Sequence, residues 1–148
     1  MDFPAGEWRR YLGSNVDTGA VLQLDEYSNK LAHFLLSAGF QHGDAVALFM
    51  ENRPEYIGLW LGCTKIGVVP ALINSNLRGK SLMHSIAAAS STAVIFGSEL
   101  TGAMAEIQTE LSTDIRLFSS GRPLNCIRLG RAEYLDQARQ LHKLQSGI

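Results

Sequence analysis

The sequence predicts an α/β protein in which a mostly parallel sheet is flanked by helices. Apolar runs of strand length begin near residues 45, 68, 92 and 115, and stretches of helical length lie between them. The run over residues 45–50 is continuously apolar, which is typical of a strand covered on both faces in a parallel sheet. The spacing of the four runs, roughly 23 residues, accommodates one strand, one helix and short loops. Alternating strands and helices then imply right-handed crossover connections.

Composition restricts the class of protein. The chain has 148 residues, 13 basic and 14 acidic side chains, a formal charge of −1 and 46% hydrophobic residues. That length suits one domain or a piece of one. The balanced charge argues against a nucleic-acid-binding protein, and the apolar content argues against disorder. Two cysteines exclude a disulfide framework. With no signal peptide and no apolar run near the roughly 20 residues of a spanning helix, the chain as written is expected to be soluble and cytoplasmic.

The first predicted helix follows an irregular lead-in over residues 1–20. Asp25 is suited to cap this helix, and Gly39 ends it because glycine accepts the left-handed conformation. Between them, apolar residues at three- and four-residue spacing predict one buried face. These residues are Tyr27, Leu31, Phe34, Leu35 and Ala38.

The first two strands enclose a helix that we expect to be largely buried. Residues 45–50 form the first strand, and Pro54 fits the first turn of the following helix, where no N–H is needed. Residues 68–73 form the second strand, in which Pro70 disfavours a central, fully hydrogen-bonded position. The helical residues expected in the core are Tyr56, Ile57, Leu59, Trp60, Cys63, Thr64 and Ile66.

The remaining segments continue the alternation and then lose it. The expected elements are a helix over 80–89, a strand over 92–96, a helix over 100–111 and a strand over 115–118. Beyond them, residues 132–145 are expected to form an amphipathic helix. The chain is therefore divided into the lead-in 1–20, an α/β subdomain over 21–120 and a loosely packed tail over 121–148.

Two loops have partial features of an anion-binding site. Gly79-Lys80-Ser81 follows a strand and opens a helix, but Asn74 stands where a phosphate loop requires its first glycine. We therefore interpret it as a solvated helix start. The segment Phe118–Pro123 offers hydroxyl and N–H groups, but it lacks a second glycine cluster and a lysine, so a plain turn is the favoured interpretation.

No other residues have the spacing of a catalytic or metal site. The histidines are interpreted as structural or surface residues, and Cys63 as a small apolar core residue. The four histidines and two cysteines without metal-ligand spacing are His33, His42, His84, His142, Cys63 and Cys126. The sequence therefore assigns no catalytic, cofactor-binding or metal-binding residue.

Two features of the second helix and the strand ends leave alternatives open. Gly58 and Gly62 are interpreted as a close-packing surface against the sheet and not as a membrane dimer contact. Trp60 and Tyr56 either belong to the core, as most aromatic residues on buried helices do, or line a ligand cavity.

Ligands of such sheets bind beyond the carboxyl ends of the strands. Those ends carry Glu51-Asn52-Arg53, Asn74-Ser75-Asn76, Gly97-Ser98-Glu99 and Ser119-Ser120.

Several stretches together carry a family resemblance. They are LDEYSNKLA over residues 24–32, GDAVALFMENRPEY over 43–56, and GLWLGCTKIG followed by ALINSNLR over 58–78. Phe96-Gly97-Ser98-Glu99 continues the likeness, which covers about Val21 to Leu100. These stretches resemble the amino-terminal subdomain of the fatty acid transport proteins, also called very-long-chain acyl-CoA synthetases. That family is a branch of the adenylate-forming ligases.

The resemblance implies activation of a long-chain fatty acid through an acyl-adenylate and its transfer to CoA. For the full-length enzyme it implies ATP, Mg²⁺ and CoA as cofactors, no nucleic-acid partner, and association with the endoplasmic reticulum or plasma membrane. The oligomeric state stays open.

The family's phosphate loop, Tyr-Thr-Ser-Gly-Thr-Thr-Gly-x-Pro-Lys, has no match in this sequence. Its later ribose-binding aspartate and carboxyl-terminal lysine have none either. The matched part implies a scaffold, so no cofactor is expected to bind this chain. We expect a partial subdomain (a truncated product, splice form or partial gene model) that is inactive alone. The alternatives are a non-catalytic acyl-binding or protein-interaction module on the same scaffold, and an unrelated flavodoxin-like nucleotide-binding protein.

Overall fold

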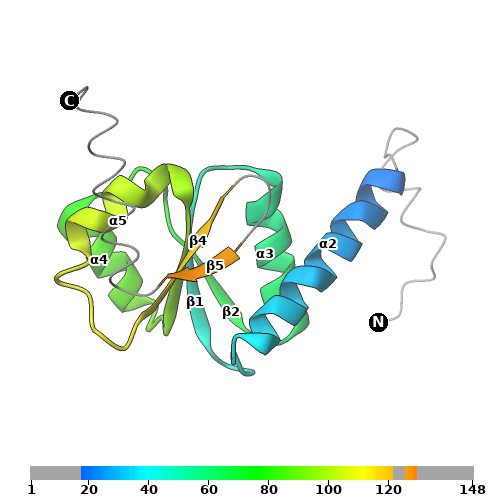
Figure 1. Ribbon diagram of the computed structural model, residues 1–148, viewed down its shortest axis with the longest axis horizontal. Coiled ribbons are helices and arrows are strands. Elements are labelled where there is room, and N and C mark those ends of the chain that lie inside the picture. The colour runs from blue at the N-terminus through cyan, green and yellow to red at the C-terminus, as the bar shows by residue number, and fades with distance from the viewer. Residues whose placement is uncertain (1–17, 122–125, 130–148) are drawn as a thin grey trace.

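The computed structural model describes residues 18–121 and 126–129, in which five strands form one sheet (Figure 1). The strand order is β2-β1-β3-β4-β5. The first four strands pair in parallel, and β5 runs antiparallel to β4. The mostly parallel sheet predicted from the sequence is therefore confirmed. The strands are β1 (Ala45–Phe49), β2 (Val69–Leu72), β3 (Ala93–Gly97), β4 (Arg116–Ser120) and β5 (Cys126–Leu129).

Helices cover both faces of the sheet and make three layers (Figure 1). Helices α2 and α3 pack on one face, and α4 and α5 pack on the other. The helices are α2 (Thr18–Ser37), α3 (Pro54–Lys65), α4 (Gly79–Ala88) and α5 (Thr101–Ile107), with a short 3₁₀ turn η1 (Ser98–Leu100) before α5. Helix α5 ends four residues before the predicted end at Leu111.

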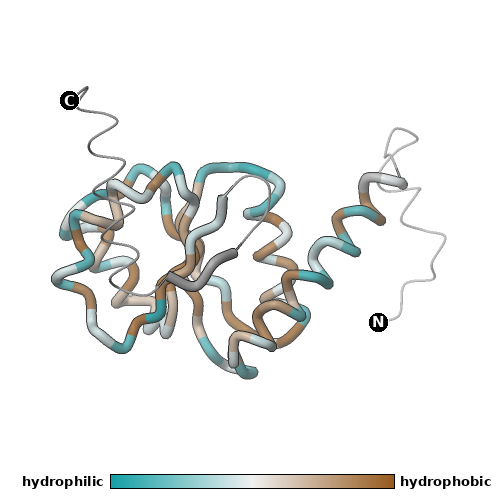
Figure 2. Tube along the Cα trace, in the orientation of Figure 1, coloured by the Kyte–Doolittle hydropathy of each residue, from teal (hydrophilic) through white to brown (hydrophobic). Residues whose placement is uncertain are grey.

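Alternate residues of each strand feed two separate cores, as side-chain alternation along a strand requires. Figure 2 shows hydrophobic colouring on the central strands and on parts of the helices on both sides of them. The core under α4 and α5 includes Phe49, Leu82, Ile86, Phe96 and Met104. The core under α2 and α3 includes Leu35, Leu48, Leu59, Ile95 and Phe118.

The start of the first helix was predicted wrongly. Helix α2 begins at Thr18, so Asp25 lies inside it and does not cap it. Residues 18–24 contain no proline, and the helix extends through them although Val21 and Leu22 are exposed. Asp25 instead faces α3, where its Oδ1 atom lies 2.6 Å from the Nζ atom of Lys65. Residues 1–17 lie outside the described part of the chain.

Strand β2 lies at the edge of the sheet, as Pro70 predicted. The Val69 N–H donates to the carbonyl oxygen of Asp44, just before β1, at 2.7 Å. The Ile73 N–H donates to the carbonyl oxygen of Leu48 in β1 at 3.0 Å. Because bonding directions alternate along a strand, Pro70 faces the open edge and its missing N–H costs no ladder bond. Val69 on this edge strand is 54% exposed.

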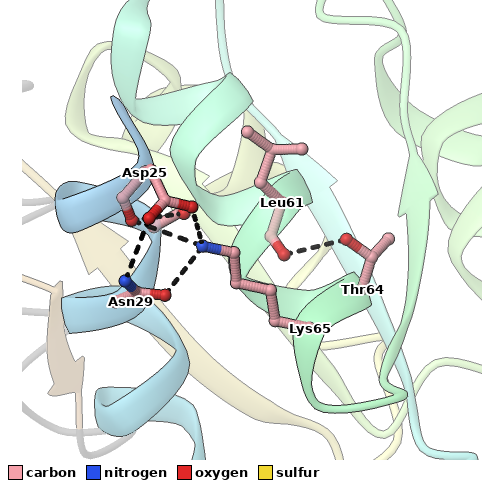
Figure 3. Close-up of polar contacts among 6 residues, drawn as sticks. Asp25, Asn29, Leu61, Thr64 and Lys65 are labelled. Atoms are coloured by element: carbon pink, nitrogen blue, oxygen red, sulfur yellow. Dashed lines mark hydrogen bonds and ion pairs between the residues drawn. The ribbon is translucent and has the colours of Figure 1, made fainter. Parts of the chain in front are cut away.

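Helices α2 and α3 approach closely because α3 presents two glycines. A Cβ atom on Gly58 would collide with the Tyr27 ring, and one on Gly62 would lie 3.1 Å from the Ser28 carbonyl oxygen. Close packing at these glycines is confirmed, but their partner is α2 and not the sheet. Figure 3 shows the polar edge of this contact, where the Nζ atom of Lys65 also donates to Asn29 Oδ1 at 2.7 Å.

Candidate functional site

Arg53 joins the carboxyl ends of β1 and β4. It precedes Pro54, and a proline disfavours the helical conformation in the residue before it. Arg53 is accordingly extended, with φ −154° and ψ 164°. Only 3% of its side chain is exposed. Its Nη2 atom donates a hydrogen bond to the carbonyl oxygen of Ser120, the last residue of β4, at 2.8 Å.

Glu99 connects the end of β3 to the same cluster. Its Oε1 atom accepts a hydrogen bond from the Glu51 N–H at 3.0 Å, and its Oε2 atom lies 3.5 Å from Arg53 Nη1. The carboxylate also lies directly over Gly97, so a Cβ atom at that position would overlap it. One arginine and one glutamate thus tie together the ends of three neighbouring strands.

Two carboxylates face the single guanidinium of Arg53. Glu55 places Oε2 at 3.8 Å from Arg53 Nε, with 12% of its side chain exposed. The cluster of Arg53, Glu55 and Glu99 therefore has a formal charge of −1. Arg53 Nε, Glu55 Oε2 and Ser120 Oγ are buried without a hydrogen-bond partner. A cluster of this sign is a poor site for a further anion such as a triphosphate.

This cluster occupies the point in the fold where ligands of doubly wound sheets usually bind. Strands β1 and β3 are neighbours in the sheet although β2 lies between them in the sequence. The chain leaves β1 toward one edge and returns on the other side of β1, which makes β1/β3 the topological switch point. Here the crevice outside these strand ends holds Glu51, Arg53 and Glu99, which bind one another.

Three of the four predicted strand ends meet in this cluster. The ends of β1, β3 and β4 come together through Arg53 and Glu99. The fourth end, after β2, forms a local turn in which Asn76 N–H donates to Asn74 Oδ1 at 2.9 Å. Interpreting Phe118–Pro123 as a plain turn was wrong for its first residues, because Ser119 and Ser120 belong to β4. Sequence reasoning missed the burial of Arg53; a charged residue between an apolar strand and a proline was the available signal.

The other motif residues have structural or surface positions. Lys80 is exposed at the start of α4, as expected of a solvated helix start. The histidines were interpreted as structural or surface residues; His33, His42 and His84 are exposed, and His142 lies outside the described residues. Cys63 is fully buried, as predicted. In residues 18–121 and 126–129, no group of three or more His, Cys, Asp or Glu side chains could hold a metal ion.

An apolar pocket lies beside the cluster, between α2 and the start of α3. Its volume is about 520 Å³, and its lining residues are Leu24, Asn52, Arg53, Pro54, Tyr56 and Ile57. Tyr56 is partly buried, and burial raises the pKa of its hydroxyl. One turn further along α3, Trp60 is 43% exposed, so the prediction that it belongs to the core was wrong. One face of α3 packs on the sheet and another on α2, and Ile57 and Trp60 lie on the part of α3 that is exposed.

Family membership is decided by comparison over most of the chain. The model of the AMP-binding enzyme family matches residues 22–138. This chain belongs to the AMP-binding enzyme family. Long-chain fatty acid transport protein 1 from Rattus norvegicus is 46% identical over 99 residues, 67% of this chain and 15% of that protein. Long-chain fatty acid transport protein 6 from Mus musculus is 42% identical over 96 residues, 64% of this chain and 16% of that protein.

Solved structures share the fold of this AMP-binding family chain. The N-terminal domain of FACL13 from Mycobacterium tuberculosis superposes with a TM-score of 0.61 at 23% identity, covering 80% of this chain and 28% of that one. The anthranilate CoA ligase AuaEII, in complex with anthranoyl-AMP, gives a TM-score of 0.64 at 19% identity, covering 80% and 22%. The resemblance to the fatty acid transport proteins and the α/β fold are thus confirmed.

Two further observations concern the extent of the family match and the helices of this chain. The chain spans about 15% of the length of the transport protein 1 relatives that it matches. Among the described residues, no helix is both long enough and apolar enough to cross a bilayer.

Proposed function

We propose that this chain is part of an enzyme that activates long-chain fatty acids. The whole enzyme would join the fatty acid carboxylate to the AMP moiety of ATP and release pyrophosphate. The CoA thiol would then displace AMP and form acyl-CoA. ATP, Mg²⁺ and CoA are the proposed cofactors, and no nucleic acid is a proposed partner. The observation that carries this proposal is the 46% identity over 99 residues to a long-chain fatty acid transport protein.

Within that enzyme, the described residues are proposed to act as scaffold. The switch-point crevice is filled by Glu99 and Arg53. Together with Glu55 these side chains have a formal charge of −1, which disfavours ATP phosphates. The described residues also lack a metal-binding group of carboxylates and histidines. We therefore infer that no catalytic, cofactor-binding or metal-binding residue of the reaction lies among the described residues.

Two experiments test the two halves of this proposal. The chain alone, assayed for ATP–pyrophosphate exchange with oleate, is expected to give no turnover above a heat-killed control. In rat long-chain fatty acid transport protein 1, the aligned 99 residues are replaced by those of this chain. The chimaera is expected to form oleoyl-CoA at a rate comparable with its parent. A folded chimaera without ligase activity, beside an active parent, would contradict the scaffold role.

Association of the whole enzyme with the endoplasmic reticulum or plasma membrane is part of the same proposal. Long-chain fatty acids partition into bilayers, so the enzyme would meet its substrate there. Flotation of the full-length protein with liposomes tests this point.

A non-catalytic acyl-binding or protein-interaction module is the second candidate. The apolar pocket of about 520 Å³ and the half-exposed Trp60 beside it favour this function. In a Trp8→Phe background, Trp60 is the only tryptophan, and saturable quenching by a brominated fatty acid would support acyl binding. Ile57→Asp should abolish the quenching, whereas Val69→Asp on the distant β2 edge should not.

A further inference from the structure

The geometry around Glu99 points to a binding site for a carboxylate group. We propose that the Glu51 N–H, the backbone of Gly97 and the Arg53 guanidinium form a carboxylate cradle, in which Glu99 is the resident ligand. An external carboxylate would bind the cradle when the Glu99 side chain is removed. The proposal concerns residues of this chain alone and does not depend on the ligase role.

Each wall of the carboxylate cradle contributes a distinct contact. The Glu51 N–H donates to one carboxylate oxygen at 3.0 Å, and the Arg53 guanidinium faces the other at 3.5 Å. Gly97 supplies the floor, since only a residue without a Cβ atom leaves room for the carboxylate. A backbone N–H and an arginine are the donors that carboxylates bind most strongly in proteins.

The cradle is built from fixed parts. The hydrogen bond to the Ser120 carbonyl fixes the Arg53 guanidinium, and the Arg53 side chain is almost completely buried. Glu51 and Gly97 are anchored by the central strands β1 and β3, which pair with each other. The occupant is less confined, because 27% of the Glu99 side chain is exposed. The cradle therefore opens to solvent on the side of Glu99.

Exchange of one carboxylate for another preserves the local charge. Glu55 lies 3.8 Å from Arg53 Nε, so one acidic group already faces the arginine from another side. A monoanionic carboxylate in place of Glu99 restores the original charge count, whereas a phosphate dianion adds negative charge beside Glu55. The ligand class is therefore a carboxylate and not a phosphate.

The test compares Glu99→Ala with Gly97→Ala/Glu99→Ala. The first variant empties the cradle, and the second fills it with a methyl group. Gly97 has φ −68° and ψ 142°, a conformation that alanine also adopts, so the added methyl brings no backbone strain. Glu106→Ala, on the exposed side of α5, is the control for loss of a glutamate.

Thermal unfolding is measured in sodium acetate, acetamide, phosphate or chloride at matched ionic strength. Glu99→Ala is expected to melt about 5 °C below the wild type in chloride. Acetate should recover most of that loss with saturable dependence on concentration, and acetamide and phosphate should not. The double variant and Glu106→Ala should show no acetate-specific shift. Octanoate is titrated beside acetate: tighter binding of octanoate identifies a fatty acid as the source, and equal binding identifies any small carboxylate.

Two results would overturn the proposal. One is a folded Glu99→Ala variant whose melting temperature is the same in acetate and chloride. The other is an acetate effect of equal size in Glu99→Ala and the double variant. If Glu99→Ala does not fold in chloride, its folding is measured as acetate is added. A variant that stays unfolded in acetate would then contradict the proposal. The Glu51 amide resonance of Glu99→Ala should also return toward its wild-type position on addition of acetate.

Discussion

Replacing Arg53 by alanine should lower the stability of the chain by about 3 kcal/mol. The bond from its guanidinium to the Ser120 carbonyl is charge-assisted, and such bonds contribute roughly 1.5–3 kcal/mol. The substitution also leaves the carboxylates of Glu55 and Glu99 without their cation. Their side chains are 12% and 27% exposed, so solvent compensates part of this loss, and the 3–5 kcal/mol of a fully buried broken pair is an upper bound.

Urea unfolding followed by circular dichroism measures this loss directly. Arg53→Lys keeps the positive charge but loses the planar guanidinium, whose two terminal nitrogens reach Ser120 and Glu99. We therefore expect this variant to lose about half as much stability as Arg53→Ala. Arg78→Ala is the matched control, because its Nη1 atom bonds the nearby Ser75 and Leu77 carbonyls and the residue is exposed. The control should change stability by less than about 0.5 kcal/mol. If Arg53→Ala were no more destabilising than Arg78→Ala, Arg53 would not join the strand ends energetically.

Four further substitutions test other parts of the structure. Gly62→Ala should lower the stability measured by urea unfolding by about 1–3 kcal/mol, because its Cβ atom would press on the α2 backbone. Gly102→Ala should instead raise the stability by up to about 1 kcal/mol, because a Cβ atom there meets nothing within 4 Å. Lys65 lowers the pKa of Asp25 below its usual value; the resulting stability is present above the unfolded pKa and is lost as pH falls through the folded pKa. Asp25→Asn should therefore flatten the acid limb of the thermal stability profile, and an unchanged limb would contradict the pair. Pro70→Thr should leave thermal stability nearly unchanged but increase aggregation measured by light scattering, because it adds an N–H donor to an open sheet edge.

The strands could be predicted from the sequence because they depend on local apolar runs. Residues 45–49 and 93–97 form central strands with both faces covered, so every position is apolar or small, and the run is visible without knowledge of the fold. Pro54 and Pro70 likewise reveal a helix start and a sheet edge, since the missing N–H restricts a proline wherever the chain folds. Strand β5 has no such signal, because four residues at an antiparallel edge can be of almost any composition.

The position of Arg53 could not be predicted, because it depends on contacts between distant residues. Its partners Glu99 and Ser120 lie 46 and 67 residues away in the sequence. The exposure of Trp60 has a similar origin. Helix α3 is apolar, as predicted, but Gly58 and Gly62 pack against α2 and not against the sheet, and Trp60 stays 43% exposed.

Family membership and local chemistry lead to different expectations at the switch point. The family binds AMP, and a doubly wound sheet offers its switch point to ligands. A nucleotide phosphate placed there would meet Glu55 and Glu99 at close range. Two unit charges of the same sign 4 Å apart repel by about 4 kcal/mol at the effective dielectric of a protein surface. The single charge of Arg53 cannot offset two carboxylates and a triphosphate together. The same groups that would repel a phosphate hold three strand ends in place, which is the property that a scaffold for a nucleotide site located elsewhere would need.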